Sequence, residues 1–296
     1  MTISLRFFIG LLMLLSSATT ASAYGLGTKT IAVKIFVDDE EPRRKDYWQE
    51  VLGRRLDRAS TILSGYGSIR FSVIRFGTWD SDDGFHHFAT SLKEFEKETD
   101  PKPAELAIGF TSQYRLTRGD TNLGGTRGPM RKHILIREGS PNVQEIERLE
   151  VLVHELAHYL GAAHSARADS VMRPVLGDGQ SRARSFRIQL DEANASIVRL
   201  VSFEMANRNV MNMHRLSIPT KVGIREQYAN LARDFPDDPV ALAYVKVMDR
   251  SIKASLAVRQ RQREAAKQKA NTSSASPETQ KSKANSTSPG GTRPVP

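Results

Sequence analysis

Residues 154–164 read HELAHYLGAAH, and this short stretch contains three of the 7 histidines in the chain. His154 and His158 are four residues apart, so on a helix they lie on the same face, where both imidazoles can reach one metal ion at about 2.0–2.1 Å. Glu155 is about 100° further around such a helix than His154. It therefore lies beside the ion rather than on it, which is where a general base for a water molecule belongs.

The third histidine can share this ion only if the helix ends before it. His164 follows His154 by ten residues, and ten residues of helix rise about 15 Å, which is too far for a shared ligand. Gly161 can adopt the left-handed conformation found at helix ends, so we predict that the chain turns back there. The alternative is three histidines without a metal at the end of an amphipathic helix, where each ring would need a buried partner.

Composition restricts the chemistry further. The chain has 296 residues, of which 39% are hydrophobic, and it has no cysteine. This length allows one or two domains with a sizeable core. The absence of cysteine excludes disulfides, a thiol nucleophile and thiolate-bound metal clusters. Any metal must therefore be held by histidine, carboxylate or carbonyl groups.

The positive charge of the chain is concentrated at its C-terminal end. Of the formal net charge of +10, residues 259–296 contribute +6, from eight Lys or Arg and two Glu, and Arg6 contributes +1. Residues 24–258 therefore carry only +3. Because they lack clustered basic side chains with interleaved aromatics, we do not expect nucleic-acid binding.

The first 23 residues predict export. Arg6 precedes the apolar run Phe7–Leu15, and Ala21-Ser22-Ala23 supplies small residues before a predicted cleavage at Tyr24. This is the pattern of a secretory signal peptide. The apolar run is short for a helix that spans a bilayer, and an uncleaved anchor is the alternative. We therefore expect a secreted or periplasmic protein without a stable membrane span.

Hydrophobic periodicity predicts strands that alternate with helices. The predicted strands are residues 30–37, 69–76, 105–110 and 133–137. The predicted helices are residues 46–65, 91–97 and 186–205, together with a long helix that Pro141 opens and that carries the histidines. This order predicts an α/β (α+β) fold with a twisted, mostly parallel sheet.

The histidine stretch, including its internal glycine, is similar to the zinc-binding signature of the metzincin metalloproteases. The segment SVMRP, residues 170–174, resembles the Met-turn of that family, and its form is most similar to the matrixin group. The upstream layout resembles the reprolysin-like members, in which residues 123–126 (LGGT) would be the antiparallel edge strand. The resemblance covers roughly residues 30–205.

The resemblance implies a metzincin-like catalytic domain with an active-site helix and a Zn²⁺ cofactor. It assigns His154, His158 and His164 to the metal, Glu155 to the general base, and Met172 to a hydrophobic base under the metal.

The resemblance also implies how substrate binds. An extended protein or peptide substrate would add to the edge strand at Leu123, Gly124 and Gly125. The loop 175–185 resembles the wall of the pocket beyond the scissile bond. Arg182 and Arg184 lie in this loop, and our own hypothesis, which the resemblance does not imply, is that they favour acidic substrate residues just after the cut.

The C-terminal third predicts a helical hairpin followed by a tail. Residues 222–233 and 239–257 have helical spacing, and the hairpin within 206–258 resembles one tetratricopeptide unit. It is either a helical appendage packed on the protease or a docking module for a partner. Residues 259–296 are rich in Lys, Ser, Ala, Pro and Gly and are predicted to be a disordered basic tail.

The sequence thus predicts a signal peptide (1–23), a metzincin-like zinc protease domain (24–205), the hairpin (206–258) and the tail (259–296). The expected function is that of a secreted endopeptidase that hydrolyses peptide bonds through a zinc-bound water activated by Glu155. The alternatives are a zinc-dependent amidase on a non-protein polymer and a catalytically silent zinc-containing binding protein. Glu155 argues against the second, and the three ligands argue against a purely structural zinc, which usually has four.

Overall fold

The computed structural model describes residues 27–41, 43–82, 84–85, 87–112, 123–138 and 143–274. The predicted signal peptide, residues 1–23, lies outside the described residues. So does the last part of the predicted tail, residues 275–296.

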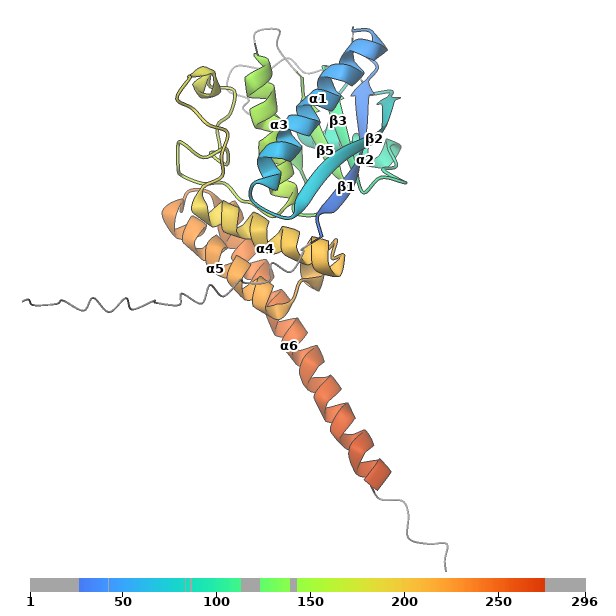
Figure 1. Cartoon of the computed structure of the whole chain (residues 1–296), viewed down its shortest axis with the longest axis vertical. Coiled ribbons are helices and arrows are strands. Elements are labelled where there is room, and N and C mark those ends of the chain that lie inside the picture. The colour runs from blue at the N-terminus through green and yellow to red at the C-terminus, as the bar shows by residue number, and fades with distance from the viewer. Residues whose placement is uncertain are drawn as a thin grey trace, which may run out of the picture.

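A five-stranded sheet in the order β2-β1-β3-β5-β4 forms the centre of the fold (Figure 1). β1 pairs in parallel with β2 and β3, β3 pairs in parallel with β5, and β4 runs antiparallel to β5. The strands are β1 Lys29–Asp38, β2 Ile69–Trp79, β3 Leu106–Thr111, β4 Gly124–Thr126 and β5 His133–Arg137. The helices are α1 Lys45–Ser64, α2 Phe88–Glu98, α3 Glu145–Tyr159, α4 Glu192–Arg208, α5 Ile218–Asp234 and α6 Pro239–Ser274, with short 3-10 helices η1 Gln180–Arg182 and η2 Met213–Arg215. This confirms the predicted mixed α/β fold with a mostly parallel sheet.

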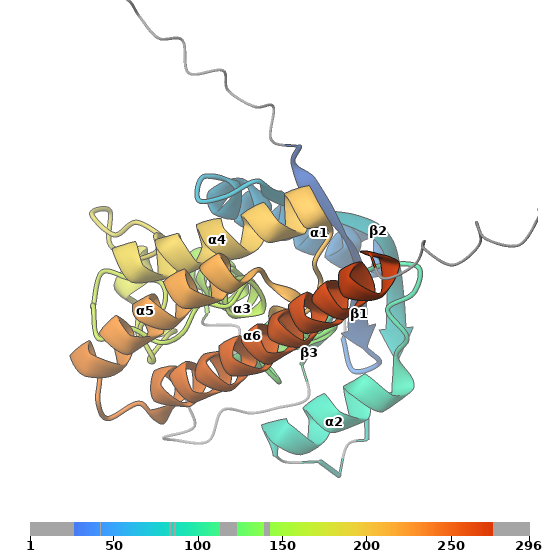
Figure 2. The ribbon, with the colours of Figure 1, turned by 90° about the horizontal axis from the view of Figure 1, so that it is seen from below.

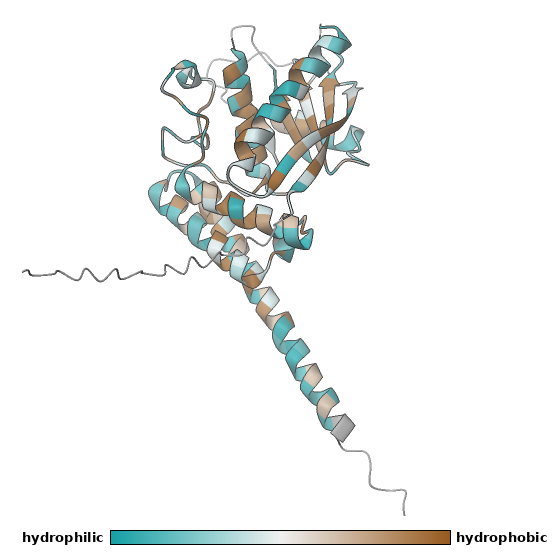
Figure 3. Ribbon diagram, viewed as in Figure 1, coloured by the Kyte–Doolittle hydropathy of each residue, from teal (hydrophilic) through white to brown (hydrophobic). Residues whose placement is uncertain are grey.

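The sheet separates two buried cores because successive side chains of a strand point to opposite faces. Ile31, Val33 and Ile35 of β1 belong to the larger core, to which α1 and α3 also contribute. Phe36 belongs to the smaller core, together with Phe95 of α2. Figure 3 shows that the strands and α3 carry much of the apolar character of the chain. α3, which bears the histidines, is thus anchored on the larger core.

The helices α4, α5 and α6 form a second layer beside this unit, as Figure 2 shows. Asp191 caps α4 by accepting from the backbone N–H of Asn194, and Ser217 caps α5 in the same way. Tyr228 of α5 lies in the same buried core as Ile31 of β1. The predicted hairpin is therefore present as α5–α6, and it shares the larger core with the sheet, α1 and α3 rather than having one of its own.

Two helices begin later than the sequence predicts, and a cap explains each start. The long helix begins at Glu145, because the Glu147 carboxylate accepts from the backbone N–H of Gln144 at 2.8 Å. Pro141, the predicted start, lies outside the described residues. α4 begins at Glu192 rather than at residue 186, since Asp191 supplies its cap.

Residues 259–274 are helical, contrary to the predicted disorder. They continue α6 to Ser274, because Gln, Arg, Glu, Ala and Lys are good helix formers. The side chain of Gln260 also donates to Glu264 one turn further on. This outer part of α6 is mostly hydrophilic (Figure 3). In the described part of the chain, no helix is both long and apolar enough to cross a membrane.

Candidate metal centre and active site

The last turns of α3 present His154 and His158 side by side. The Nδ1 atom of each ring is hydrogen-bonded to a backbone carbonyl. Nδ1 of His154 donates to the carbonyl of Val171 at 2.8 Å, and Nδ1 of His158 donates to the carbonyl of Ala162 at 2.9 Å. A carbonyl only accepts hydrogen bonds, so each Nδ1 carries the ring proton. In the neutral rings each Nε2 therefore presents a lone pair.

The chain reverses at Gly161, which is where the sequence predicts the helix to end. Gly161 has a φ of 97°, in the region that L side chains rarely adopt. Its N–H donates to the carbonyl of His158 at 2.9 Å, and the N–H of Ala162 donates to Ala157 at 2.9 Å. The reversal brings His164 back beside the two helical histidines.

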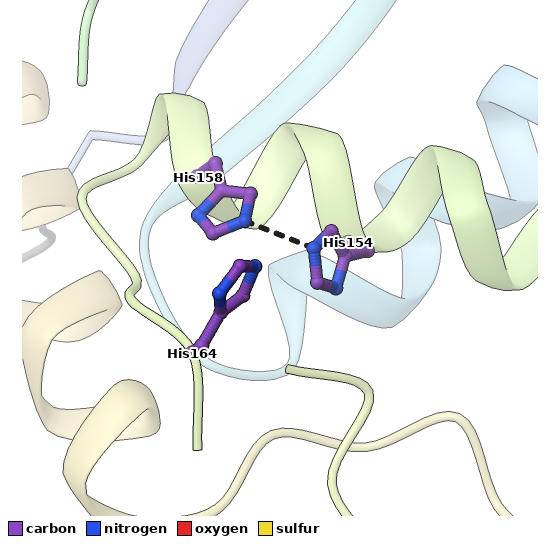
Figure 4. Close-up of side chains that lie close together, drawn as sticks. All are labelled: His154, His158 and His164. Atoms are coloured by element: carbon purple, nitrogen blue, oxygen red, sulfur yellow. Dashed lines mark hydrogen bonds between the residues drawn. The ribbon is translucent and has the colours of Figure 1, made fainter. Parts of the chain in front are cut away.

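The three imidazoles converge on one point (Figure 4). One nitrogen from each of His154, His158 and His164 lies within 4.8 Å of the other two. The Nε2 atoms of His154 and His158 are 2.9 Å apart, and two bare lone pairs at this separation repel each other unless a cation lies beside both. Three imidazoles on one side of an ion are the ligand set of catalytic zinc sites, so the three histidines present fit Zn²⁺.

Burial keeps these rings in the form that binds metal. Burial and the neighbouring His158 and His164 lower the pKa of His154 well below its usual range. Burial and the nearby His164 lower the pKa of His158 to about 4. Since a metal binds the neutral imidazole, the site does not require a proton to be removed from these two rings at neutral pH.

Glu155 lies next to the histidines and against the edge strand. Burial raises the pKa of its carboxyl group to about 8, and a neighbouring dication would oppose this shift by favouring the ionised form. Among the described residues, its Oε2 atom has no hydrogen-bond partner. A Cβ atom at Gly124 would lie 2.8 Å from Oε1 of Glu155, so only glycine lets β4 approach the carboxyl group this closely.

The predicted Met-turn connects the two parts of the histidine cluster. Met172 is fully buried, and its carbonyl accepts from the N–H of Ser165, the residue after His164, at 2.9 Å. The preceding carbonyl, that of Val171, holds His154. The turn therefore fixes a helical ligand and the loop of the third ligand at once.

A cleft with a volume of about 240 Å³ opens over Glu155 and the three histidines. The predicted substrate residues Leu123, Gly124 and Gly125 line it, and its remaining lining residues are Thr126, Gly128, Pro174, Leu176, Val240 and Tyr244. Arg182 and Arg184 do not line this cleft in the described part of the chain. Arg182 instead donates to Glu147 of α3 at 2.9 Å, which gives no support to its predicted role in substrate selection.

Three side chains that sequence reasoning missed hold the segment that carries the third histidine. Asn194 of α4 bonds both backbone groups of Ala163, each at 2.9 Å. The hydroxyl of Tyr228 in α5 donates to the carbonyl of Gly161 at 2.6 Å, and Asp238 contacts His164. All three contacts join residues far apart in the sequence. The one sequence feature that points to any of them is the acidic turn 234–238 between two predicted helices, which contains Asp238.

Comparison with known proteins identifies the family. The sequence profile of the matrixins matches residues 21–199, which include the histidines and Met172, and a search of curated proteins finds no match. Among solved structures, archaemetzincin from Methanopyrus kandleri matches with 13% identity and a TM-score of 0.40 over 60% of this chain and 96% of its own. The structure of a chaperone–substrate complex matches with 10% identity and a TM-score of 0.43 over 60% of this chain and 38% of its own. Because the matrixin profile covers more than half of the chain, including the whole histidine cluster, the chain belongs to the matrixin family of metzincin zinc metalloproteases.

Proposed function

We propose that this protein is a secreted endopeptidase in which His154, His158 and His164 hold a zinc ion and Glu155 is the general base. The observation that carries the proposal is the arrangement of three imidazoles around one point, beside a buried carboxyl group that lines a cleft. Zinc bound there would supply Lewis-acid polarisation of the scissile carbonyl and of the attacking water.

Glu155 moves the proton in this mechanism. Its Oε2 atom, which no described residue engages, accepts a proton from the attacking water as the new C–O bond forms. The same carboxyl group then delivers this proton to the leaving amine as the C–N bond breaks. Glu155 is only 4% exposed, which limits exchange of this proton with bulk solvent.

The edge strand β4 orients the substrate. One edge of β4 pairs with β5, and residues 124–126 also line the cleft. An extended peptide can add there as a further strand through main-chain hydrogen bonds. This form of recognition needs no chain terminus, which favours internal cleavage of proteins or peptides.

Export is proposed from the sequence of residues 1–23 alone. A basic residue, an apolar run and small residues before Tyr24 have the order of a cleavable signal peptide. The mature protein would then act outside the cytoplasm, in the periplasm or the medium.

The experiment that tests the catalytic proposal is the substitution Glu155→Gln, with zinc content and casein hydrolysis measured on the same samples. We expect stoichiometric zinc in both proteins and a loss of activity of about 10²–10⁴-fold in the variant. Glu226→Gln, at an exposed glutamate of α5, is the control and should retain full activity.

Two other results would contradict the proposed endopeptidase. Wild-type protein with stoichiometric zinc but no action on casein or an unbiased peptide pool would support the amidase or the binding protein. Protein without stoichiometric zinc after careful purification would contradict the proposed metal centre.

A further inference from the structure

The third histidine differs from the other two in the group that holds its ring. His154 and His158 donate to backbone carbonyls. Nδ1 of His164 instead lies 2.5 Å from Oδ2 of Asp238, in the loop between α5 and α6. The aspartate side chain is only 11% exposed and that of His164 26%, so solvent screens this contact poorly.

Both carboxylate oxygens of Asp238 accept a hydrogen bond. Oδ2 accepts from His164, and Oδ1 accepts from the backbone N–H of Val240 in the first turn of α6 at 2.7 Å. The N–H of Asp238 itself donates to the carbonyl of Phe235 at the end of α5. The carboxylate is therefore fixed by the hairpin before it meets the imidazole.

The hairpin is also fixed to the segment that carries His164. Tyr228 of α5 binds the carbonyl of Gly161 at 2.6 Å, and the ring of Tyr228 packs on that of Tyr244 in α6 with centroids 5.1 Å apart. Tyr244 and Val240 line the same cleft as the histidines. The hairpin thus holds both the start of the reversal and the ring at its end.

A carboxylate behind a ligand has a stronger effect than a carbonyl. It fixes the Nδ1–H tautomer, aims the ring, and increases the basicity of the metal-binding Nε2. Asp238 lies beyond residues 21–199, the range that matches the matrixins, so this contact comes from a part of the chain outside the family match.

We propose that Asp238 is a positioning residue for His164, through which the α5–α6 hairpin sets the affinity of the metal centre. The proposal rests on the proposed function, because it requires His164 to be a metal ligand. It implies that the hairpin is a component of the active site rather than only a docking module.

The test compares Asp238→Ser with Asp237→Ser in the purified protein. Serine can still cap the first turn of α6, but its short side chain cannot reach the imidazole. Asp237 is exposed and adjacent in the same loop, so its replacement removes the same charge without touching His164.

The zinc dissociation constant is measured by competition with a chromophoric chelator. We expect it to rise about 10–100-fold in Asp238→Ser and to change less than about twofold in Asp237→Ser, a limit set by the weak effect of exposed charges.

A second measurement reports the tautomer of the His164 ring directly. In metal-free protein, ¹⁵N NMR of the histidine side chains gives the tautomer of His164. We expect the Nδ1–H form in the wild type and in Asp237→Ser, and a mixture of tautomers in Asp238→Ser. If Asp238→Ser fails to fold, Asp238→Asn replaces it. Its single acceptor oxygen can serve either the ring or the helix N-terminus, so the same changes are expected.

The outcomes separate this proposal from the proposed function. Wild-type protein that binds zinc and cleaves peptides, together with an Asp238→Ser variant of unchanged zinc affinity and unchanged tautomer, would overturn the role of Asp238 and leave the protease intact. Wild-type protein that binds no zinc would contradict the metal centre and with it this proposal, whatever the tautomer.

Discussion

α3 is held by charged groups at its N-terminal end and almost entirely by neutral groups at its C-terminal end. At the N-terminal end, the buried guanidinium of Arg55 donates two bonds to Glu145, both at 2.8 Å, and also pairs with Glu138. Arg148 of the same helix turn pairs with Glu138 as well. Arg55 and Glu138 are 1% and 3% exposed, so this cluster lies within the protein.

At the C-terminal end, carbonyls hold two histidines, an amide holds Ala163, and a hydroxyl holds Gly161. The exception is Asp238, whose carboxylate pairs with His164. Neutral acceptors fix the rings without compensating the charge of a bound dication, which leaves that charge available for chemistry. The charged cluster thus anchors α3 at its N-terminal end, away from the histidines.

Glu138→Gln should have the largest effect on stability and no effect on zinc affinity. The substitution leaves the buried Arg55 without its full counter-charge, and breaking a buried pair in this way costs about 3–5 kcal/mol. Urea denaturation of the metal-free protein measures the free energy of unfolding. The control is Glu50→Gln, whose exposed pair with Arg54 on α1 is worth less than about 1 kcal/mol. A drop in zinc affinity in Glu138→Gln as large as its drop in stability would refute the division between the two ends.

The same cluster predicts the acid side of the stability curve. Burial raises the pKa of Glu138, but the charges of Arg55, Arg148 and Arg43 outweigh this and lower it overall. Its contribution is therefore complete above the unfolded-state pKa of about 4.3 and is lost as the pH falls through the lower folded value. Between pH 6 and pH 3, the stability of Glu138→Gln should fall less than that of the wild type.

The contrast between the two ends also explains which features could be predicted from the sequence. The pair His154 and His158 follows from the helical repeat, and the reversal at Gly161 follows from backbone sterics, because both depend on neighbours within a few residues. Asn194 and Asp238 act on residues 31 and 74 positions away. Such contacts depend on the packing of α4–α6, which no local period encodes. The continuation of α6 to Ser274 differs from the predicted disorder because helix propensity outweighs polar composition there.

Asn194→Ala should have an intermediate effect that extends to the metal. Asn194 is fully buried and bonds both the N–H and the carbonyl of Ala163. Without it, two buried backbone groups lose their partners, at about 1–2 kcal/mol each, and the loop of His164 loosens. We expect a loss of about 2–4 kcal/mol in the free energy of unfolding, measured in urea, and weaker zinc binding by chelator competition. Asn207→Ala, at an asparagine of α4 whose hydrogen bond is exposed, is the control. Unchanged zinc affinity in Asn194→Ala would mean that the loop keeps its shape without this amide.

Gly161→Ala should have the smallest effect on stability, but it tests the reversal itself. At a φ of 97°, an alanine is strained by about 1–3 kcal/mol, and its Cβ atom would lie 3.3 Å from Cγ2 of Ile197. The strain can be relieved only by turning the segment that carries His164, so zinc affinity should fall together with stability. Gly53→Ala is the matched control, because Gly53 lies within α1 and its added Cβ would make only an ordinary contact with Phe76 at 3.6 Å. That substitution should stabilise the protein by up to about 1 kcal/mol, as measured in urea. If Gly161→Ala and Gly53→Ala changed the free energy of unfolding in the same direction, the left-handed backbone at Gly161 would not be what turns the chain back toward the two helical histidines.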